Sequence, residues 1–213
     1  MTGMDARLQR LIELAGKPAP EDRAALALEL CDLLADWPMK YPSEMREPFE
    51  TLLEKCVREV DASTRARVAA RIASREEAPV PLLNELFFDA PAEAKAKIVE
   101  RNAEANGHCT TEAADEASLI AAAREAKGEA FAADFARLLG IEPVTARRIL
   151  SEPSGDALAI ACKGAHLTRA AFSTLAVLFA PDAQASDKRL AAYEAVPQEA
   201  ASGMLRHWRN EAA

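Results

Sequence analysis

The chain has 213 residues, of which half are hydrophobic and only 5% aromatic, and its formal net charge is −8 at pH 7. That length provides one large domain or two small ones. Alanine, the best helix former, supplies much of the hydrophobic fraction, and residues that favour strands are scarce. The composition therefore predicts an all-α protein. It disfavours a protein that binds nucleic acid over its whole surface, because an acidic chain repels phosphate.

The charge is unevenly distributed along the chain. Residues 1–128 contain 17 basic and 24 acidic side chains, whereas residues 129–213 contain 9 and 10. A nucleic-acid-binding surface, if the chain has one, is therefore expected in the C-terminal half. The alternative interpretation is that the acidic excess serves only solubility.

The N-terminal half has apolar residues at helical spacing, interrupted by prolines. A short helix is predicted over 5–15, and a second opens at Pro20 and stops at Pro38. Further apolar stripes follow in 49–60, 68–72, 82–87 and 98–99.

One turn in this half recurs. Val60-Asp61-Ala62, followed by Ala66-Arg67, is echoed 28 residues later by Phe88-Asp89-Ala90, followed by Ala94-Lys95. A repeated unit of a helix, a turn that contains Asp and a second helix indicates stacked helical hairpins. We therefore expect HEAT-like helical hairpins in 1–106 and a helical bundle in 107–213. The alternative is that both pack as one continuous domain.

From Phe131 to Phe179 a helix-turn-helix pattern occurs twice. Gly140 marks the first turn, and His166 occupies the corresponding place in the second. The residues 26 positions after the apolar or small residues of the first copy are also apolar or small. The residues of the first copy are Phe135, Ala136, Leu139, Ile141, Ala146 and Ile149. Small residues let two helices approach, so the bundle is predicted to contain two helix-turn-helix-like units.

The sequence 132–151 is a candidate DNA-binding unit. Its second helix would begin at Pro143 and present Thr145, Arg147 and Arg148 outward to phosphates or base edges, with Arg169 a further candidate contact. The unit contains three arginines against one Asp and one Glu, so few phosphate contacts are available. The alternative, that this pair of helices is only a packing motif, is therefore the stronger one.

A protein-binding surface is the other hypothesis, because stacked hairpins bind protein segments more often than they catalyse. Candidate interface residues are aromatic and basic; they are Trp37, Tyr41, Arg206, Trp208 and Arg209. The alternative for each is core or terminal packing. We expect a non-enzymatic adaptor or regulator that binds another protein, with DNA binding as the second choice.

The sequence does not indicate catalysis. None of the three histidines has the spacing of a metal site, and the eight glycines form no phosphate-binding loop. His108-Cys109 is the one adjacent pair suited to thiol chemistry, but no partner acid is indicated. We expect no enzyme activity, no metal and no cofactor.

The cysteines, the N-terminal residues and the length of the apolar runs indicate the cellular compartment in which the protein is expected. The four cysteines lie far apart and include no C-x-x-C pair, which fits a reducing cytoplasm. The N-terminus is too highly charged for a signal peptide. The longest uncharged apolar run, 170–180, is far below the roughly 20 residues of a spanning helix. We expect a soluble cytoplasmic protein without membrane contact.

The C-terminal half contains a set of short motifs in a fixed order. They are Leu139-Gly140, Arg147-Arg148, Glu152-Pro153-Ser154-Gly155, the alanine-rich 157–161 and Leu167-Thr168-Arg169. This order resembles an uncharacterised bacterial all-helical family, a domain of unknown function with HEAT-like N-terminal repeats. The resemblance implies an all-α fold, and it implies neither a known enzymatic activity nor agreed catalytic residues.

Overall fold

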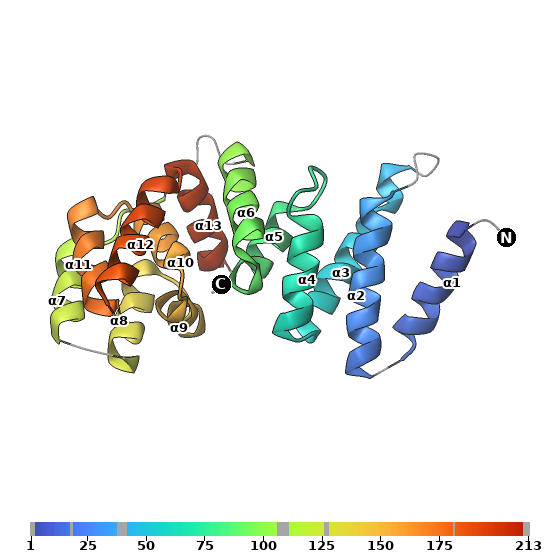
Figure 1. Cartoon of the computed structure of the whole chain (residues 1–213), viewed down its shortest axis with the longest axis horizontal. Coiled ribbons are helices and arrows are strands. Elements are labelled where there is room, and N and C mark those ends of the chain that lie inside the picture. Colours follow the sequence, from blue (N-terminus) through green and yellow to red (C-terminus); the bar gives the residue numbers. More distant parts are fainter. Residues whose placement is uncertain are drawn as a thin grey trace. The chain divides into compact units, whose positions relative to one another are not determined.

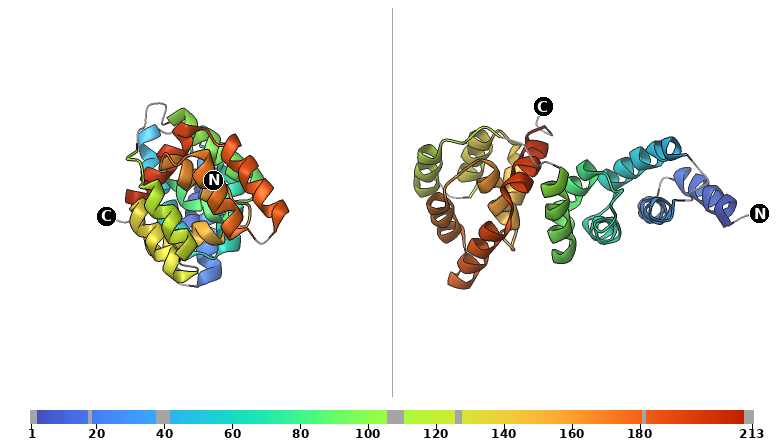
Figure 2. Two further views of the ribbon diagram at one scale, coloured as in Figure 1. Left: turned by 90° about the vertical axis from the view of Figure 1, so that its left-hand side faces the viewer. Right: turned by 90° about the horizontal axis from the view of Figure 1, so that it is seen from above.

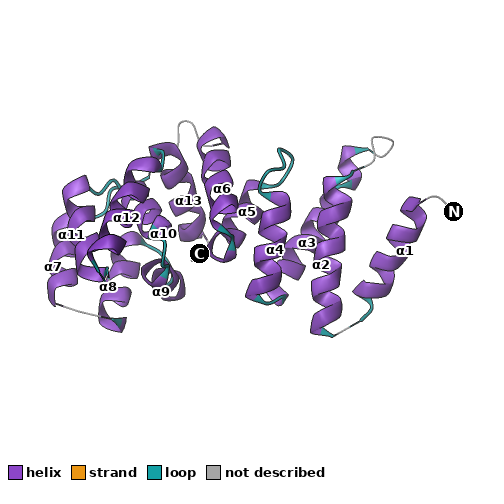
Figure 3. Cartoon of the chain, in the orientation of Figure 1, coloured by secondary structure: helices purple, strands orange, loops and turns teal. Residues whose placement is uncertain are grey.

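A computed structural model of the chain describes residues 3–17, 19–37, 42–105, 111–125, 128–180 and 182–210. These residues form helices and connecting loops with no strand among them, which confirms the predicted all-α class (Figure 3). The α-helices are α1 (Gly3–Ala15), α2 (Pro20–Ala35), α3 (Glu47–Glu59), α4 (Ala62–Ile72), α5 (Val80–Leu86), α6 (Ala92–Ala105), α7 (Glu116–Glu125), α8 (Glu129–Leu139), α9 (Pro143–Ser151), α10 (Asp156–Gly164), α11 (Arg169–Phe179), α12 (Ala183–Ala195) and α13 (Gln198–Asn210). Two short 3-10 helices are η1 (Ser43–Met45) and η2 (Phe87–Asp89). Within the described ranges, every helix is too short or too polar to cross a bilayer.

The chain separates into two compact units (Figure 1). Unit 1 comprises residues 1–98 and unit 2 residues 99–213. The division falls within α6, whereas the boundary expected from the sequence, between residues 106 and 107, lies outside the described residues.

Unit 1 is built from consecutive helices that pack on their neighbours, with α2 in contact with α1, α3 and α4. Its α2 buries Leu26, Leu30 and Leu33 completely. The predicted Asp-containing turn at residues 60–62 is present, and Asp61 is the N-cap of α4, where its carboxylate accepts the Thr64 backbone N–H at 2.9 Å. Ion pairs join the outer edges of these helices; they are Arg7–Asp36, Arg10–Glu29, Arg23–Glu59, Arg71–Asp32, Arg58–Glu85 and Arg65–Asp89.

Unit 2 is centred on α10 and α13, which lie side by side; Figure 2 shows the same helices from two other directions. From Ala157 to Cys162 every residue of α10 is buried, and so is every residue of α13 from Ala200 to Leu205. The two helices approach closely at Gly164, where a Cβ atom would lie 2.5 Å from the Ala201 carbonyl oxygen. Glycine, which has no Cβ atom, therefore fits at this crossing, whereas alanine would clash with the Ala201 backbone.

The two predicted helix-turn-helix units are α8 with α9 and α10 with α11. Their turns have the same backbone conformation, because Gly140 has φ = +67° and His166 has φ = +58°. In both, the amide after the left-handed residue closes the helix: Ile141 donates to Ala136 and Leu167 to Cys162, each at 3.0 Å. The pattern of buried positions in the first copy also recurs in the second. The internal duplication predicted from the sequence is confirmed.

The junction between the two copies is held by a buried acid. The Glu152 carboxylate accepts the Gly155 N–H at 2.8 Å and lies 2.7 Å from the Ser154 hydroxyl. The Arg189 side chain packs so closely on Gly155 that a Cβ atom there would lie 2.3 Å from Arg189 Cγ. Burial lowers the pKa of Arg189, and the charge of Glu152 opposes that shift. The Glu-Pro-Ser-Gly motif therefore serves to fix α9 relative to α10.

Candidate functional site

The described part of unit 2 contains an open groove between the start of α8, the end of α9 and the end of α11. It is lined by Gly128, Glu129, Ala132, Arg147, Leu150, Ser151 and Phe179. The space open to water in it is about 460 Å³. Pockets of about 300 to 1,000 Å³ are the size that holds ligands or partner side chains. We refer to this feature as the α8–α9–α11 groove.

The floor of the groove is apolar and held in place by aromatic packing. Phe179, the last residue of α11, stacks on Phe131 of α8 with ring centroids 4.5 Å apart and planes 21° apart. Phe131 is fully buried and Ala132 nearly so, and Leu150 adds a half-buried aliphatic chain. Offset aromatic pairs of this kind contribute about 0.5–1.5 kcal/mol beyond the area they bury. The floor is therefore preformed in the structure.

The rim of the groove carries one opposite-charge pair. Arg147 Nη1 lies 3.2 Å from Glu129 Oε2, and these side chains are 49% and 79% exposed. An exposed ion pair contributes at most about 1 kcal/mol, because water screens the charges and two long side chains lose freedom. This pair therefore contributes little to holding the two side chains at the rim.

The α8–α9 turn is tied to the C-terminal helix. Arg209 of α13 donates from Nε to the Leu139 carbonyl at 2.7 Å and from Nη2 to the Glu112 carbonyl at 3.4 Å. In the second copy, the Tyr193 hydroxyl donates to the Leu167 carbonyl at 2.8 Å. Each turn thus has a backbone carbonyl bonded by a later helix, so α9 and α11 have defined positions.

The residues predicted to contact nucleic acid have different environments. Thr145 is only 7% exposed, so the prediction that it points outward is wrong: it lies on the side of α9 that packs against the unit. Arg147 and Arg148 are exposed on α9 as predicted. Arg169 lies at the start of α11, with its Nε 2.5 Å from Glu194 Oε1.

The α8–α9 surface is not strongly basic. Arg137 lies 3.2 Å from Asp134, in addition to the Arg147–Glu129 pair, and Glu142 is exposed at the start of α9. Carboxylates beside arginines oppose phosphate binding, because most non-specific affinity for DNA comes from uncompensated positive charge. The helix-turn-helix shape is therefore combined with both signs of charge on this surface.

The predicted protein-interface residues divide in the same way. Trp208 is 1% exposed, so the interface prediction is wrong for it, because its ring belongs to the core. Arg209 is used to hold the Leu139 carbonyl, and Arg206 is exposed on α13. Trp37 is half-buried with its ring 5.7 Å from that of Phe49. Tyr41 lies outside the described residues, as do His108 and Cys109.

Most groove residues were not singled out from the sequence. Arg147 is the one lining residue among the predicted contact residues, and the sequence predicted it as a contact to nucleic acid. Glu129 and Arg147 belong to different helices, and Phe179 ends a third. The sequence feature that could have indicated the groove is Phe179, an aromatic residue that ends an apolar stretch two residues before Pro181.

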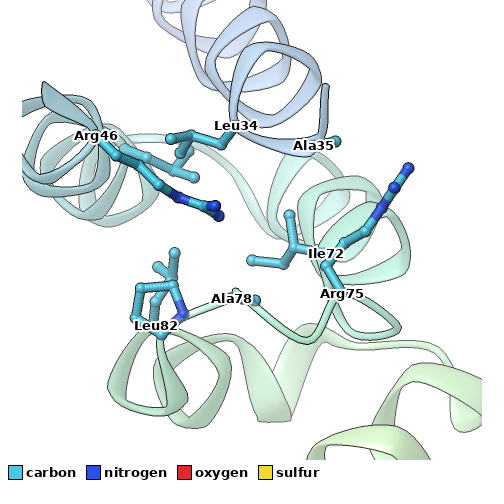
Figure 4. Close-up of a pocket in the computed structure, with 9 residues that line it drawn as sticks. Leu34, Ala35, Arg46, Ile72, Arg75, Ala78 and Leu82 are labelled. Carbon is cyan, nitrogen blue, oxygen red and sulfur yellow. The ribbon is translucent and has the colours of Figure 1, made fainter. Parts of the chain in front are cut away.

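Unit 1 contains a smaller pocket, shown in Figure 4, between α2, α3, α4 and α5. Its walls include Leu34, Leu53, Ile72 and Leu82, and the space open to water is about 20 Å³. That volume holds about one water molecule. Arg46 points into the pocket, while its Nε bonds Glu50 at 2.7 Å. We therefore treat it as a packing feature of unit 1.

Comparison with known proteins gives one match. The model of the family described as "Uncharacterised protein conserved in bacteria (DUF2336)" matches residues 50–206, which include both helix-turn-helix copies and all residues that line the groove. No curated protein and no solved structure matches the chain.

Proposed function

We propose that this chain, which belongs to the uncharacterised bacterial family DUF2336, is a non-enzymatic cytoplasmic adaptor that binds another protein in the α8–α9–α11 groove. In this proposal unit 1 is a HEAT-like scaffold of stacked hairpins, and unit 2 holds the binding site. No cofactor, metal or membrane takes part.

The observation that supports the proposal is the composition of the groove. Aliphatic and aromatic carbon forms its floor, at Ala132, Leu150 and Phe179, and a polar rim surrounds it. Protein-binding sites have this arrangement, in which an apolar anchor enters a dry centre and the rim excludes water. The Arg147–Glu129 pair at the rim gives the site both signs of charge.

DNA binding remains the second hypothesis because α8 and α9 have the helix-turn-helix shape and expose Arg147 and Arg148. The carboxylates of Glu129 and Asp134 beside arginines on this surface weigh against it. We expect no binding of duplex DNA even at low ionic strength, where phosphate contacts are strongest.

Site-specific photo-crosslinking in a bacterium that encodes the chain tests the proposal. A benzophenone side chain replaces Ser151, which is exposed at the groove, and a matched strain carries it at Lys188, which is exposed on α12. We expect one defined protein adduct from Ser151 that is absent from Lys188. The adduct should weaken when Arg147→Glu places two like charges at the rim.

The double variant Arg147→Ala with Arg148→Ala serves as a folding control, because both side chains are exposed and their loss should leave stability almost unchanged. If the Ser151 position yields no adduct above the Lys188 background, the groove is not a protein-binding site. Saturable duplex binding that Arg147→Ala abolishes would favour the DNA hypothesis instead.

A further inference from the structure

Arg189 of α12 is a buried cation with unused hydrogen-bond donors. The residue is only 6% exposed, and within the described part of the chain its Nε and Nη1 atoms have no hydrogen-bond partner. A buried N–H group without an acceptor destabilises the fold, because it has lost its bonds to water. Such groups are rare in folded proteins, so we expect an acceptor within reach of Arg189.

Glu152 is an acceptor that meets Arg189 at Gly155. Its carboxylate accepts the Gly155 N–H at 2.8 Å, and Arg189 packs on the same glycine, with its Cα 3.3 Å from the place of a Gly155 Cβ atom. A carboxylate has about four acceptor positions. The Ser154 N–H, the Ser154 hydroxyl and the Gly155 N–H are already bonded to this one. Glu152 must therefore release part of this turn before it can bond Arg189.

The Ser154 hydroxyl has a second acceptor within reach. It lies 2.7 Å from Glu152 Oε1 and 2.6 Å from Asp156 Oδ2. A hydroxyl carries one proton, so it can donate to only one of these two carboxylates at a time. If it donates to Asp156, Glu152 loses a donor and the hydroxyl remains bonded. The cluster thus allows two hydrogen-bonding arrangements, which differ in the acid that Ser154 bonds.

The two arrangements leave different N–H groups without acceptors. In the structure these are the Nε and Nη1 groups of Arg189. When Glu152 bonds Arg189 instead, the buried Gly155 amide loses its acceptor. The two costs are of the same kind, because each leaves a buried donor unbonded. Costs of the same kind bring two arrangements close in free energy, which is the condition for both to be populated.

The junction of α9 and α10 bears directly on the groove wall. Glu152 follows Leu150 and Ser151, which line the α8–α9–α11 groove at the end of α9. Its side chain ties this end of α9 to the start of α10 at Gly155. When the carboxylate moves to Arg189, that tie is lost and the groove wall becomes less ordered. Arg189 is not a lining residue, so its influence on the groove passes through Glu152.

We propose that Glu152, Ser154 and Arg189 form a two-position switch that sets the order of the groove wall. In one position Glu152 holds the turn before α10, and in the other it bonds Arg189 while Ser154 donates to Asp156. The switch rests on the proposed function only in its consequence, which is that a bound partner selects the position that fits it. The exchange between positions is a property of the chain without a partner.

Methyl relaxation-dispersion NMR of the full chain, with labelled leucines, tests the switch without a partner. Leu150 should show exchange on the microsecond-to-millisecond timescale, whereas Leu30, fully buried in unit 1, is the internal reference and should show none. Arg189→Met keeps an unbranched side chain but has no donor, so it should abolish the exchange. Lys188→Met is the matched control, because Lys188 is exposed on α12 and its loss should leave the exchange unchanged.

Ser154→Ala gives a second test that does not depend on the stability of Arg189→Met. It removes one donor from the position in the structure, so the other position gains population and the exchange at Leu150 should grow. A flat dispersion profile at Leu150 in the natural chain would overturn the proposal, and so would exchange that survives Arg189→Met. If Arg189→Met does not fold, exchange that Ser154→Ala leaves unchanged has the same meaning.

The switch and the groove can fail separately. Exchange at Leu150 without a crosslinked adduct at Ser151 would refute the groove as a protein-binding site and leave the switch in place. A normal adduct with a flat dispersion profile would refute the switch and leave the groove in place.

Discussion

The close approach of α10 and α13 at Gly164 makes Gly164→Ala an informative perturbation. A Cβ atom at residue 164 would lie 2.5 Å from the Ala201 carbonyl oxygen and 2.9 Å from Leu205 Cβ. Non-bonded heavy atoms are most stable about 3.5–4.0 Å apart, so the two helices must separate by about 1 Å. A backbone carbonyl cannot rotate out of the way as a side chain does.

Two effects oppose each other in this substitution. Alanine within a helix is favoured over glycine by about 0.5–1 kcal/mol. Overpacking a tightly packed core costs about 1–3 kcal/mol. The clash involves backbone atoms at the centre of unit 2, so we expect the second effect to win and the net loss to be about 1–2 kcal/mol. For a chain of this length, that corresponds to a fall in the melting temperature of about 2–8 °C.

Urea unfolding measures this loss. Trp208 lies in α13 and reports on unit 2, so its fluorescence in a Trp37→Phe background follows the relevant unit, and far-ultraviolet circular dichroism follows the whole chain. Gly16→Ala is the control, because a Cβ atom there meets only the carbonyl oxygens of Ile12 and Glu13, both at 3.7 Å. If Gly164→Ala is as stable as the natural chain, α10 and α13 do not approach as closely as described.

Three further predictions concern single sites. Gly140→Val should lower unfolding free energy by about 1–2 kcal/mol, because a left-handed φ of +67° is strained for a β-branched residue; an unchanged melting midpoint would contradict this. The pKa of Asp61 is lowered from 3.8 to about 2, chiefly by the hydrogen bond from the Ser63 hydroxyl. The ionised carboxylate therefore stabilises unit 1 fully above pH 3.8, and this stability is lost as the pH falls through about 2. Asp61→Ala should therefore be less stable at neutral pH, with the difference shrinking between pH 4 and pH 2 in chemical denaturation series. Burial raises the pKa of Cys31 to about 12 and also raises that of Cys162, so both thiols should resist alkylation at pH 8 until the chain unfolds, and mass spectrometry showing rapid native labelling would disprove their burial.

The sequence predicted the features that depend on neighbouring residues. Helical spacing and abundant alanine indicated the all-α class, and the predicted turn at Asp61 is held by a hydrogen bond within four residues. The turns at Gly140 and His166 are likewise closed by hydrogen bonds between residues only five positions apart, so their repetition was visible in the sequence itself. Local backbone geometry restricts which residues fit, and that restriction leaves a pattern in the sequence.

Only the tertiary structure decided which of the residues that the sequence predicts to be exposed are in contact with solvent. Thr145 and Trp208 lie on the packed sides of amphipathic helices, and the pattern of the sequence does not show how wide that side is. Arg209 bonds a carbonyl 70 residues away, and the groove is formed where the ends of α8, α9 and α11 meet. Such contacts depend on how helices cross, and the crossing is set by the combined fit of many side chains. The spacing of apolar residues within a single helix does not determine how the side chains of two helices fit together.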